Sequence, residues 1–329
     1  MKRLLAITIV VLGTFNSQGQ DAHLSLYDAA PLYLNPAMTG AFQGDWRLHA
    51  QYRTQWKAVN FKPYTSALVS YDVSHKKWGF GAQLSNFRAG IGNYNAFQGS
   101  LSAAYTTSID RKKNHNLSFG VQAGLTQKTL EYQLLTFNNQ YTTNNGGEFN
   151  TSISSNENFG GQSLIVPVAN AGILYFFAKQ ESRINPFVGV SAFNLTQPQE
   201  TFFDFDNRLP IRYYAHVGTR INLTETFYLL PKALYMRQKE FQELTLAVDA
   251  GYYLKGSDLY LLGGAIYRNR DAAIAYIGAK MDQFILKVGY DINVSSLTTA
   301  SSGRGGFEVS FTYMHQKDRK KTDKICPRL

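Results

Sequence analysis

The sequence predicts an all-β protein, a transmembrane outer-membrane β-barrel of about 14 antiparallel strands. Three observations lead to this fold class. Apolar and polar residues alternate through long segments, which is the period of a strand with two unlike faces. Most of these segments have about 9 to 14 residues, and a tilted strand that crosses a bilayer needs about 9 to 11. Beyond the N-terminus, no window reaches the roughly 18 uninterrupted apolar residues of a membrane helix, and the mean hydropathy is −0.25.

The first residues have the composition of a secretory signal peptide. Lys2 and Arg3 form a charged start, residues 4–12 form an apolar core, and a Ser-Gln-Gly sequence at 17–19 is a cleavage site with small residues. We therefore expect residues 1–20 to direct export and to be removed.

The segment that follows, residues 21–44, is too long for a simple lead-in to a strand. Its Pro, Gly and aromatic content suits a compact plug that finds polar partners for its irregular backbone inside the barrel. We expect it to fill the lumen and to keep it closed at rest.

Residues 45–316 carry the alternation and form the predicted barrel. In the first segment, apolar residues at 46, 48, 50 and 52 alternate with polar residues at 47, 49, 51 and 53. Counting every such segment, we expect strands near 45–56, 64–74, 77–88, 94–107, 115–128, 166–178, 183–194, 211–223, 226–238, 241–254, 258–267, 271–280, 283–292 and 305–316. The polar positions predict a lumen lining of Arg47, His49, Arg53, Asp72, Arg212, His216, Arg220, Asp249, Lys287, Asp291 and Glu308.

The connections between the expected strands give an independent check. Outer-membrane barrels join their strands by short periplasmic turns and longer external loops in alternation. The long connections, 129–165, 195–210 and 293–304, follow the fifth, seventh and thirteenth strands, and the even-numbered connections are short and polar. This parity indicates an even number of strands, with both termini in the periplasm and with the basic turns on one side.

A soluble protein of two packed β-sheets is the alternative fold. Its apolar faces would have to turn inward, and about forty apolar and aromatic residues need a core thicker than two layers provide. Lipid is the simpler environment for these side chains, so we expect apolar residues such as Leu246, Val248, Leu286 and Phe311 to face the membrane.

Motifs for chemistry are largely missing from the sequence. The six His and one Cys have no metal-site spacing, and the chain has no nucleophile elbow, P-loop or dinucleotide fingerprint. We read His49 and His216 as part of the polar lining and expect no enzyme activity, no metal and no cofactor. The net charge of +10 does not indicate nucleic acid, which an exported protein rarely meets.

Several pieces of the sequence together resemble the PorP/SprF family of the type IX secretion and gliding systems. They are YLNPAMTGA at 33–41, WRLHAQYRTQW at 46–56, PYTSALVSYD at 63–72, YDINVSSL at 290–297 followed by GGFEVSFTY, and the CPRL terminus. The resemblance spans nearly the whole mature chain and implies an outer-membrane barrel related in design to fatty-acid channels. In those channels an N-terminal segment with a similar Asn-Pro-Ala enters the lumen as a hatch.

By this resemblance Asn35, Pro36, Ala37 and Gly40 form the plug motif. Pro36 biases Asn35 away from helix, Gly40 permits a sharp turn, and the Asn35 amide can pair with buried backbone groups. A plain surface turn at this motif remains the alternative.

The resemblance also implies two roles for the protein. It would contact the periplasmic ring and lipoproteins of the type IX apparatus, or it would serve export and surface attachment of one secreted adhesin through that adhesin's C-terminal domain. A passive channel for hydrophobic or small polar solutes is the other function that the sequence leaves open.

The basic tail, residues 317–329, follows the last expected strand. It is a candidate periplasmic docking peptide for an acidic partner, and the alternative is a disordered solubilising tail. Its proposed docking residues are Lys317, Arg319, Lys320, Lys321 and Lys324.

Overall fold

The computed structural model describes residues 23–57, 62–143, 146–179, 182–202, 206–295, 298–301 and 303–316. The expected signal peptide and the basic tail lie outside the described residues.

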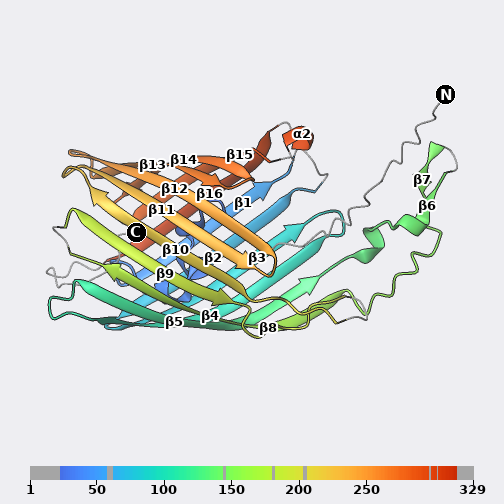
Figure 1. The fold of residues 1–329 in the computed structure, drawn as a ribbon, viewed down its shortest axis with the longest axis horizontal. Helices are drawn as coiled ribbons and strands as arrows, with labels where there is room; N and C mark the ends of the chain where they lie inside the picture. Colours follow the sequence, from blue (N-terminus) through green and yellow to red (C-terminus); the bar gives the residue numbers. More distant parts are fainter. Residues whose placement is uncertain are drawn as a thin grey trace, which may run out of the picture.

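Within the described residues, fourteen strands form one closed barrel in which each strand pairs antiparallel with its neighbours in the chain (Figure 1). β1 pairs with β2 on one side and with β16 on the other, and the second pairing closes the barrel. The strands are β1 Trp46–Gln55, β2 Tyr64–His75, β3 Trp78–Ala89, β4 Tyr94–Ser108, β5 His115–Thr129, β8 Ser163–Phe177, β9 Ile184–Phe193, β10 Arg212–Asn222, β11 Phe227–Gln238, β12 Phe241–Leu254, β13 Leu259–Arg268, β14 Ala272–Met281, β15 Phe284–Asn293 and β16 Arg304–His315. The predicted fold class is confirmed.

The two ends of the barrel differ in their connections. The long connection between β5 and β8 carries η3 Tyr132–Leu134, η4 Asn138–Gln140 and a small hairpin of β6 Tyr141–Thr142 and β7 Glu148–Phe149, and it projects beyond the barrel (Figure 1). The β15–β16 connection, with α2 Thr298–Ser301, lies at the same end. We call this the long-loop end and the opposite one the short-turn end.

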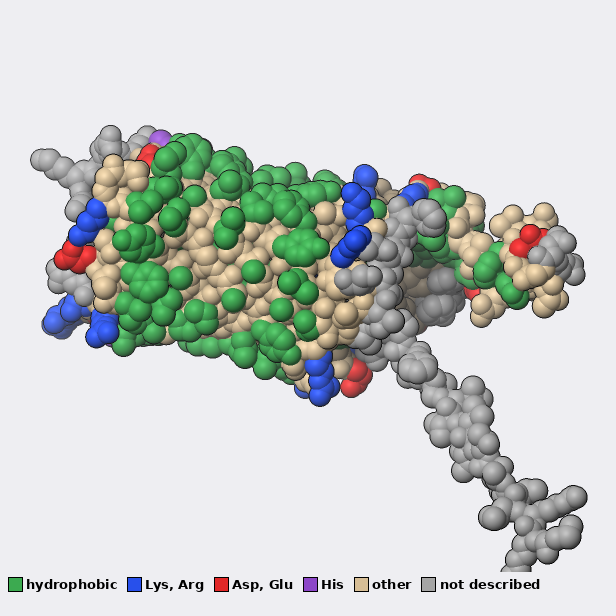
Figure 2. Space-filling view, turned by 90° about the horizontal axis from the view of Figure 1, so that it is seen from above, with side chains coloured by type: hydrophobic (Ala, Val, Ile, Leu, Met, Phe, Trp, Pro, Cys, Tyr) green, Lys and Arg blue, Asp and Glu red, His purple; other side chains and the backbone are tan. Residues whose placement is uncertain are grey.

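The barrel has apolar side chains outside and many polar ones inside. Val248 on β12 is 48% exposed, whereas Asp249 beside it is 5% exposed and points into the lumen. Leu246, Leu286 and Phe311 also lie on the outer surface. Figure 2 shows a broad apolar surface between two ends that carry the charged side chains. A closed apolar core formed by these outer residues is thereby excluded, and lipid is their environment.

Aromatic side chains mark the short-turn end of the outer surface. The Trp46 ring lies 5.8 Å from that of Tyr71 and 5.1 Å from that of Tyr313, and Trp78 lies 5.0 Å from Tyr105. Such a girdle is typical of the membrane–water interface. None of the helices in the described parts of the chain is long and apolar enough to cross a membrane.

The lumen has an apolar half that the alternation did not predict. Along β8 to β14 many inward side chains are apolar and form one cluster: Leu174, Phe176, Phe187, Phe193, Leu230, Leu234, Met236, Ile266 and Ile274. Where both faces of a strand are apolar, as in the LYFF sequence of β8, the period of two disappears from the sequence.

The inside and outside assignment can be tested on one strand. Val248→Arg puts a charge on the lipid face of β12, and we expect the free energy of unfolding to fall by about 2–4 kcal/mol. Tyr252→Arg lies on the same face nearer the short-turn end, and we expect a loss of about 1 kcal/mol or less. Urea unfolding in phospholipid vesicles measures both, and equal costs at the two positions would contradict the assignment.

Candidate functional site

The lumen of the barrel is occupied by residues 23–45, which we call the inner segment (Figure 1). It consists of η1 Tyr27–Ala29, α1 Pro31–Leu34 and η2 Pro36–Met38 with short irregular links. It starts in the half near the long-loop end, where Arg53 donates to the His23 carbonyl at 2.8 Å. It ends at the short-turn end, where the Asp45 amide donates to the His315 carbonyl at 2.7 Å.

The two ends of the described chain thus lie in opposite halves of the barrel. The residues before His23 and those after Gln316 lie outside the described part, so the periplasmic position of both termini stays a prediction.

Asn35 connects the inner segment to three barrel strands. Its Oδ1 accepts the Ala37 amide at 2.9 Å and caps η2, which begins with Pro36 because proline needs no partner for an amide hydrogen. Its Nδ2 donates to the carbonyls of Ile173 on β8 at 3.1 Å and of Val190 on β9 at 3.3 Å. The same nitrogen lies 3.2 Å from His216 Nε2 on β10.

Two barrel glycines let the backbone of the inner segment lie directly on the wall. A Cβ on Gly120 would lie 2.3 Å from the Pro36 carbonyl carbon, and a Cβ on Gly79 would lie 2.1 Å from the Thr39 carbonyl oxygen. Gly40 makes the turn after η2 with a φ of 71°, a conformation that other residues rarely adopt. Neither wall position has room for a side chain while the segment is in place.

Arg47 and Asp72 form the first of three buried ion clusters, close to the short-turn end. These residues face each other on β1 and β2, and the guanidinium donates two hydrogen bonds of 2.9 and 2.8 Å to the carboxylate. Asp72 also accepts the Gly40 amide at 2.7 Å, and Arg47 donates to the Met38 carbonyl at 3.3 Å. The pair therefore holds the end of the inner segment as well as itself.

The second cluster holds the start of the inner segment. Glu308 on β16 accepts the amides of Ser25 at 2.7 Å and Leu26 at 3.2 Å, and it also accepts a hydrogen bond from Gln51 on the wall. Arg53 lies 2.6 Å from Asp291 and 3.4 Å from Glu308, and the Ser25 hydroxyl donates to Asp291 at 2.7 Å.

The third cluster surrounds Lys232 on β11. Its ammonium lies 2.6 Å from the carboxylates of both Asp28, on the inner segment, and Asp249, on β12. Lys287 on β15 lies 3.6 Å from Asp28. An inward lysine on β11 is thus matched by Asp28, the one acidic residue of the described helical turns.

The remaining proposed lining residues also face the lumen. His49 lies between Gln51 Oε1 at 2.9 Å and Thr312 Oγ1 at 2.8 Å. The half-buried Arg220 stacks 3.8 Å from the centre of the Tyr228 ring. The predicted lining set did not include several charged and amide side chains that face the lumen: Asp28, Gln51, Lys128, Lys232 and Arg268. All but Asp28 stand at inward positions of their strands. The alternation of inward and outward positions along each strand was therefore the signal that could have identified them.

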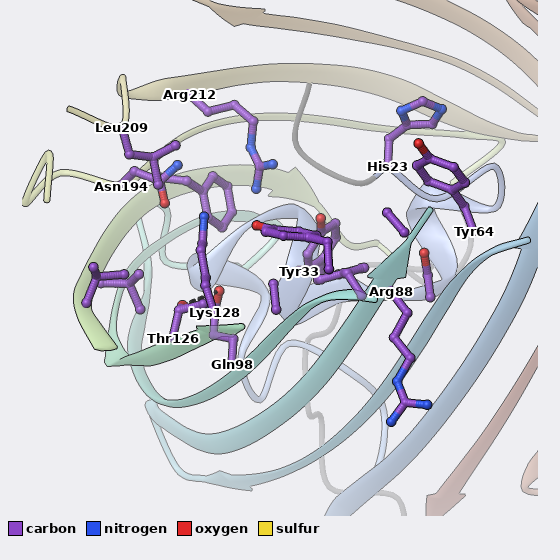
Figure 3. A pocket seen from close by; sticks show the side chains of 18 of the residues that line it. His23, Tyr33, Tyr64, Arg88, Gln98, Thr126, Lys128, Asn194, Leu209 and Arg212 are labelled. Carbon is purple, nitrogen blue, oxygen red and sulfur yellow. Dashed lines mark hydrogen bonds between the residues drawn. The ribbon is translucent and has the colours of Figure 1, made fainter. Parts of the chain in front are cut away.

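Above the inner segment, toward the long-loop end, the lumen holds a cavity of about 190 Å³. Tyr33 of the inner segment lines it together with barrel side chains from β1 to β10 (Figure 3). Arg212 and Lys128 reach into it from different walls, whereas Arg88 points away. The Arg212 guanidinium lies 5.7 Å from the Tyr33 ring and 5.2 Å from the Phe193 ring.

The described residues show no group of three or more His, Cys, Asp or Glu side chains that could hold a metal ion. The arrangement as a whole can bind, but no nucleophile, base and orienting group are brought together in the contacts described above.

Comparison with known families decides what this barrel is. A family model described as type IX secretion system membrane protein PorP/SprF matches residues 16–313. The chain belongs to the PorP/SprF family. The resemblance drawn from the opening and closing motifs is confirmed, and the PorP/SprF assignment fits an outer-membrane barrel of the type IX secretion system. No curated protein sequence matches the chain.

Solved structures similar to this PorP/SprF-family barrel include two hydrocarbon transporters. The toluene transporter TbuX of Ralstonia pickettii aligns at a TM-score of 0.52 and 10% identity, over 88% of this chain and 94% of that chain. The toluene transporter TodX of Pseudomonas putida aligns at a TM-score of 0.51 and 11% identity, over 86% of this chain and 92% of that chain. Identity this low shows a common fold and nothing further.

Lys232 offers a test of the ion clusters. Lys232→Met leaves the buried Asp249 without its cation and Asp28 with only the more distant Lys287, and we expect the free energy of unfolding to fall by about 3–5 kcal/mol. Lys255→Met removes an exposed lysine paired with Glu225, and we expect a change of about 0.5 kcal/mol or less. Combining Lys232→Met with Asp28→Asn and Asp249→Asn should restore part of the loss, and no recovery would argue against the charges as its cause.

Proposed function

We propose that this PorP/SprF-family barrel is a non-catalytic binding component of the type IX system, which supports export and surface attachment of a secreted adhesin and contacts the secretion apparatus. The observation that carries the proposal is the fixed inner segment. Three buried ion clusters, the Asn35 contacts and two side-chain-free wall positions tie it to the barrel. A lumen filled in this way favours binding of partners at the two ends of the barrel over conduction through it.

The two ends of the barrel suit two kinds of contact. Long loops are external in outer-membrane barrels and short turns are periplasmic. In this orientation the connections at 130–162 and 194–211 face the outside, where the C-terminal domain of an adhesin would bind. The short turns face the periplasm, where ring and lipoprotein components of the apparatus would bind.

In the described short turns, most of the positive charge lies on one side of the rim. The turns after β2, β4 and β8 are neighbours around the barrel. Together they carry seven exposed cations, which we call the basic arc: Lys76, Lys77, Arg111, Lys112, Lys113, Lys179 and Arg183. The turns on the opposite side carry the exposed acids Glu225, Asp258 and Asp282 and one exposed cation, Lys255, which pairs with Glu225.

The position of the basic arc favours a protein partner over lipid headgroups. Lipid surrounds the barrel on every side, so a rim built for lipid phosphates needs cations all round. A one-sided arc suits a single partner with an acidic face, placed off the barrel axis. The tail that begins after β16 starts at the same end and would add Lys317, Arg319, Lys320, Lys321 and Lys324 to this surface.

A passive channel is the second candidate function. The cavity of about 190 Å³ and the apolar half of the lumen favour it, because both lie along the route that a solute would take. The two transporters of similar fold are named for toluene, and a small hydrophobic solute would be the corresponding cargo here. The inner segment would then have to move.

Conductance separates a closed lumen from an open one. We expect the intact protein to show little ion conductance in planar bilayers, and deletion of residues 21–44 to raise it. Gly120→Val should also raise conductance, because its side chain takes the place of the Pro36 and Ala37 backbone. Gly263→Val is the matched control, since a Cβ there meets its nearest atom at 3.7 Å. Large conductance from the intact protein would contradict the closed lumen.

Secretion in cells tests the main proposal. We expect a strain without this protein to lose surface display of its adhesin. We also expect a tail truncated after Gln316 to weaken pull-down of the apparatus.

Exposed charges act weakly one by one and are screened over about 8 Å at physiological salt. Neutralising one lysine should therefore change little, and neutralising the tail cluster should weaken docking with a strong dependence on salt. Normal display in the deletion strain, with loss of uptake of a hydrophobic solute, would favour the channel.

A further inference from the structure

Two buried amide side chains in the lumen cavity each have an atom without a hydrogen-bond partner. Gln83 on β3 and Gln122 on β5 both line the cavity, and each is 3% exposed. The open atoms are Gln83 Oε1, an acceptor, and Gln122 Nε2, a donor. Asn170 donates to Gln122 Oε1 at 2.6 Å, and this bond fixes which end of the amide is left open.

Buried polar groups in folded proteins are nearly always paired, so an open donor and an open acceptor in one cavity point to a ligand that offers both. A hydrocarbon does not satisfy this requirement, because it would cover both amides without pairing either. A backbone-type amide does, since it presents its N–H and its C=O on opposite edges. Placed between β3 and β5, one such amide can accept from Gln122 and donate to Gln83.

The rest of the cavity adds an apolar surface and positive charge. Aromatic rings come together here: Tyr33 lies 5.9 Å from Phe87, and Trp56 lies 4.6 Å from Tyr64. The residues that line the cavity in the described part of the chain include the cations Lys128 and Arg212 but no Asp or Glu. Glu200 pairs with Lys128 from the loop outside the lining. These features favour a ligand with an apolar or aromatic group and an anionic end.

We propose that the cavity is a binding site for an N-acylated amino acid, with an apolar or aromatic side chain and a free carboxylate. The amide would lie between Gln83 and Gln122, the side chain on the rings of Tyr33 and Phe87, and the carboxylate toward Arg212. The volume equals that of on the order of six water molecules at roughly 30 Å³ each, which fits one residue. The same chemistry occurs in a free small molecule and at the carboxyl-terminal residue of a polypeptide.

The site is independent of the proposed role in secretion, because it rests on the cavity alone. It also differs from a hydrocarbon site, since its recognition depends on an amide and a charge.

Intrinsic fluorescence provides the test. The chain has three tryptophans, and only Trp56 lines the cavity, whereas Trp46 and Trp78 lie in the aromatic girdle. The full-length protein with Trp46→Phe and Trp78→Phe, held in lipid nanodiscs to avoid detergent in the lumen, is titrated with N-acetyl-L-phenylalanine. We expect a saturable change in Trp56 emission. N-acetyl-L-phenylalaninamide, which lacks the charge, should bind at least about tenfold more weakly, because hydrogen bonds to charged groups are the stronger ones.

Variants assign the contacts. Arg212→Gln and Gln122→Leu should each raise the Kd about tenfold, since each removes one partner of the ligand. Arg270→Gln makes the same change at an exposed arginine outside the cavity and should leave the Kd unchanged. Heat-modifiable mobility on gels shows whether each variant keeps its barrel. If Arg212→Gln does not fold, the difference in affinity between the acid and its amide, measured on the protein without this substitution, shows whether the carboxylate is recognised.

A peptide that ends in phenylalanine distinguishes the two sources. Binding of the peptide with a free carboxylate, but not of its amidated form, supports the site with a polypeptide end as its ligand. Binding of N-acetyl-L-phenylalanine without the peptide supports the site with a small molecule as its ligand. Equal affinity for the acid and its amide, tighter binding of toluene than of the acid, or no saturable binding of any probe would overturn the proposal.

Discussion

The structure depends on one constraint: the polar groups of the inner segment that its own short turns leave unpaired need partners on the barrel wall. A stretch with only short helical turns has many free amides and carbonyls, and leaving them unpaired inside a membrane protein is costly. The wall supplies the partners from many strands. Glu308 accepts two amides, Asp72 accepts a third, Ser118 donates to the Ala37 carbonyl and Ser191 donates to the Leu34 carbonyl.

The charged side chains follow from the same constraint. An isolated carboxylate on the wall would be as costly as an unpaired amide, so each buried acid also meets a cation. Ion pairs in such surroundings do little for stability compared with apolar packing, but they require one arrangement. The segment is therefore held in one register along the lumen, with the cavity on one side of it and the short-turn rim on the other. Binding at either end would meet a rigid surface.

Sequence reasoning reached the fold because a barrel in lipid with a polar lumen lining imposes a period of two on most of its strands. The inward position of Arg47, Asp249 or Glu308 could be inferred from that period alone. The hydrogen-bond and ion-pair partners of these residues could not be inferred. Contacts between the inner segment and the wall can join residues that are far apart in the sequence, such as Ser25 and Glu308. The apolar half of the lumen was hidden because strands that are apolar on both faces lose the alternation. The roles of Gly79 and Gly120 could not be predicted either. The need for glycine at these positions becomes clear only once the backbone of the inner segment is seen against them.

Closure of the barrel by β1 and β16 has a consequence for biogenesis. The inner segment leaves the ribosome before any strand, yet Glu308, which holds its start, lies on the last strand. The contacts that hold the start of the segment can therefore form only once β16 is in place beside β1. The pairing of β16 with β1, which closes the barrel, thus also completes the attachment of the inner segment to the wall.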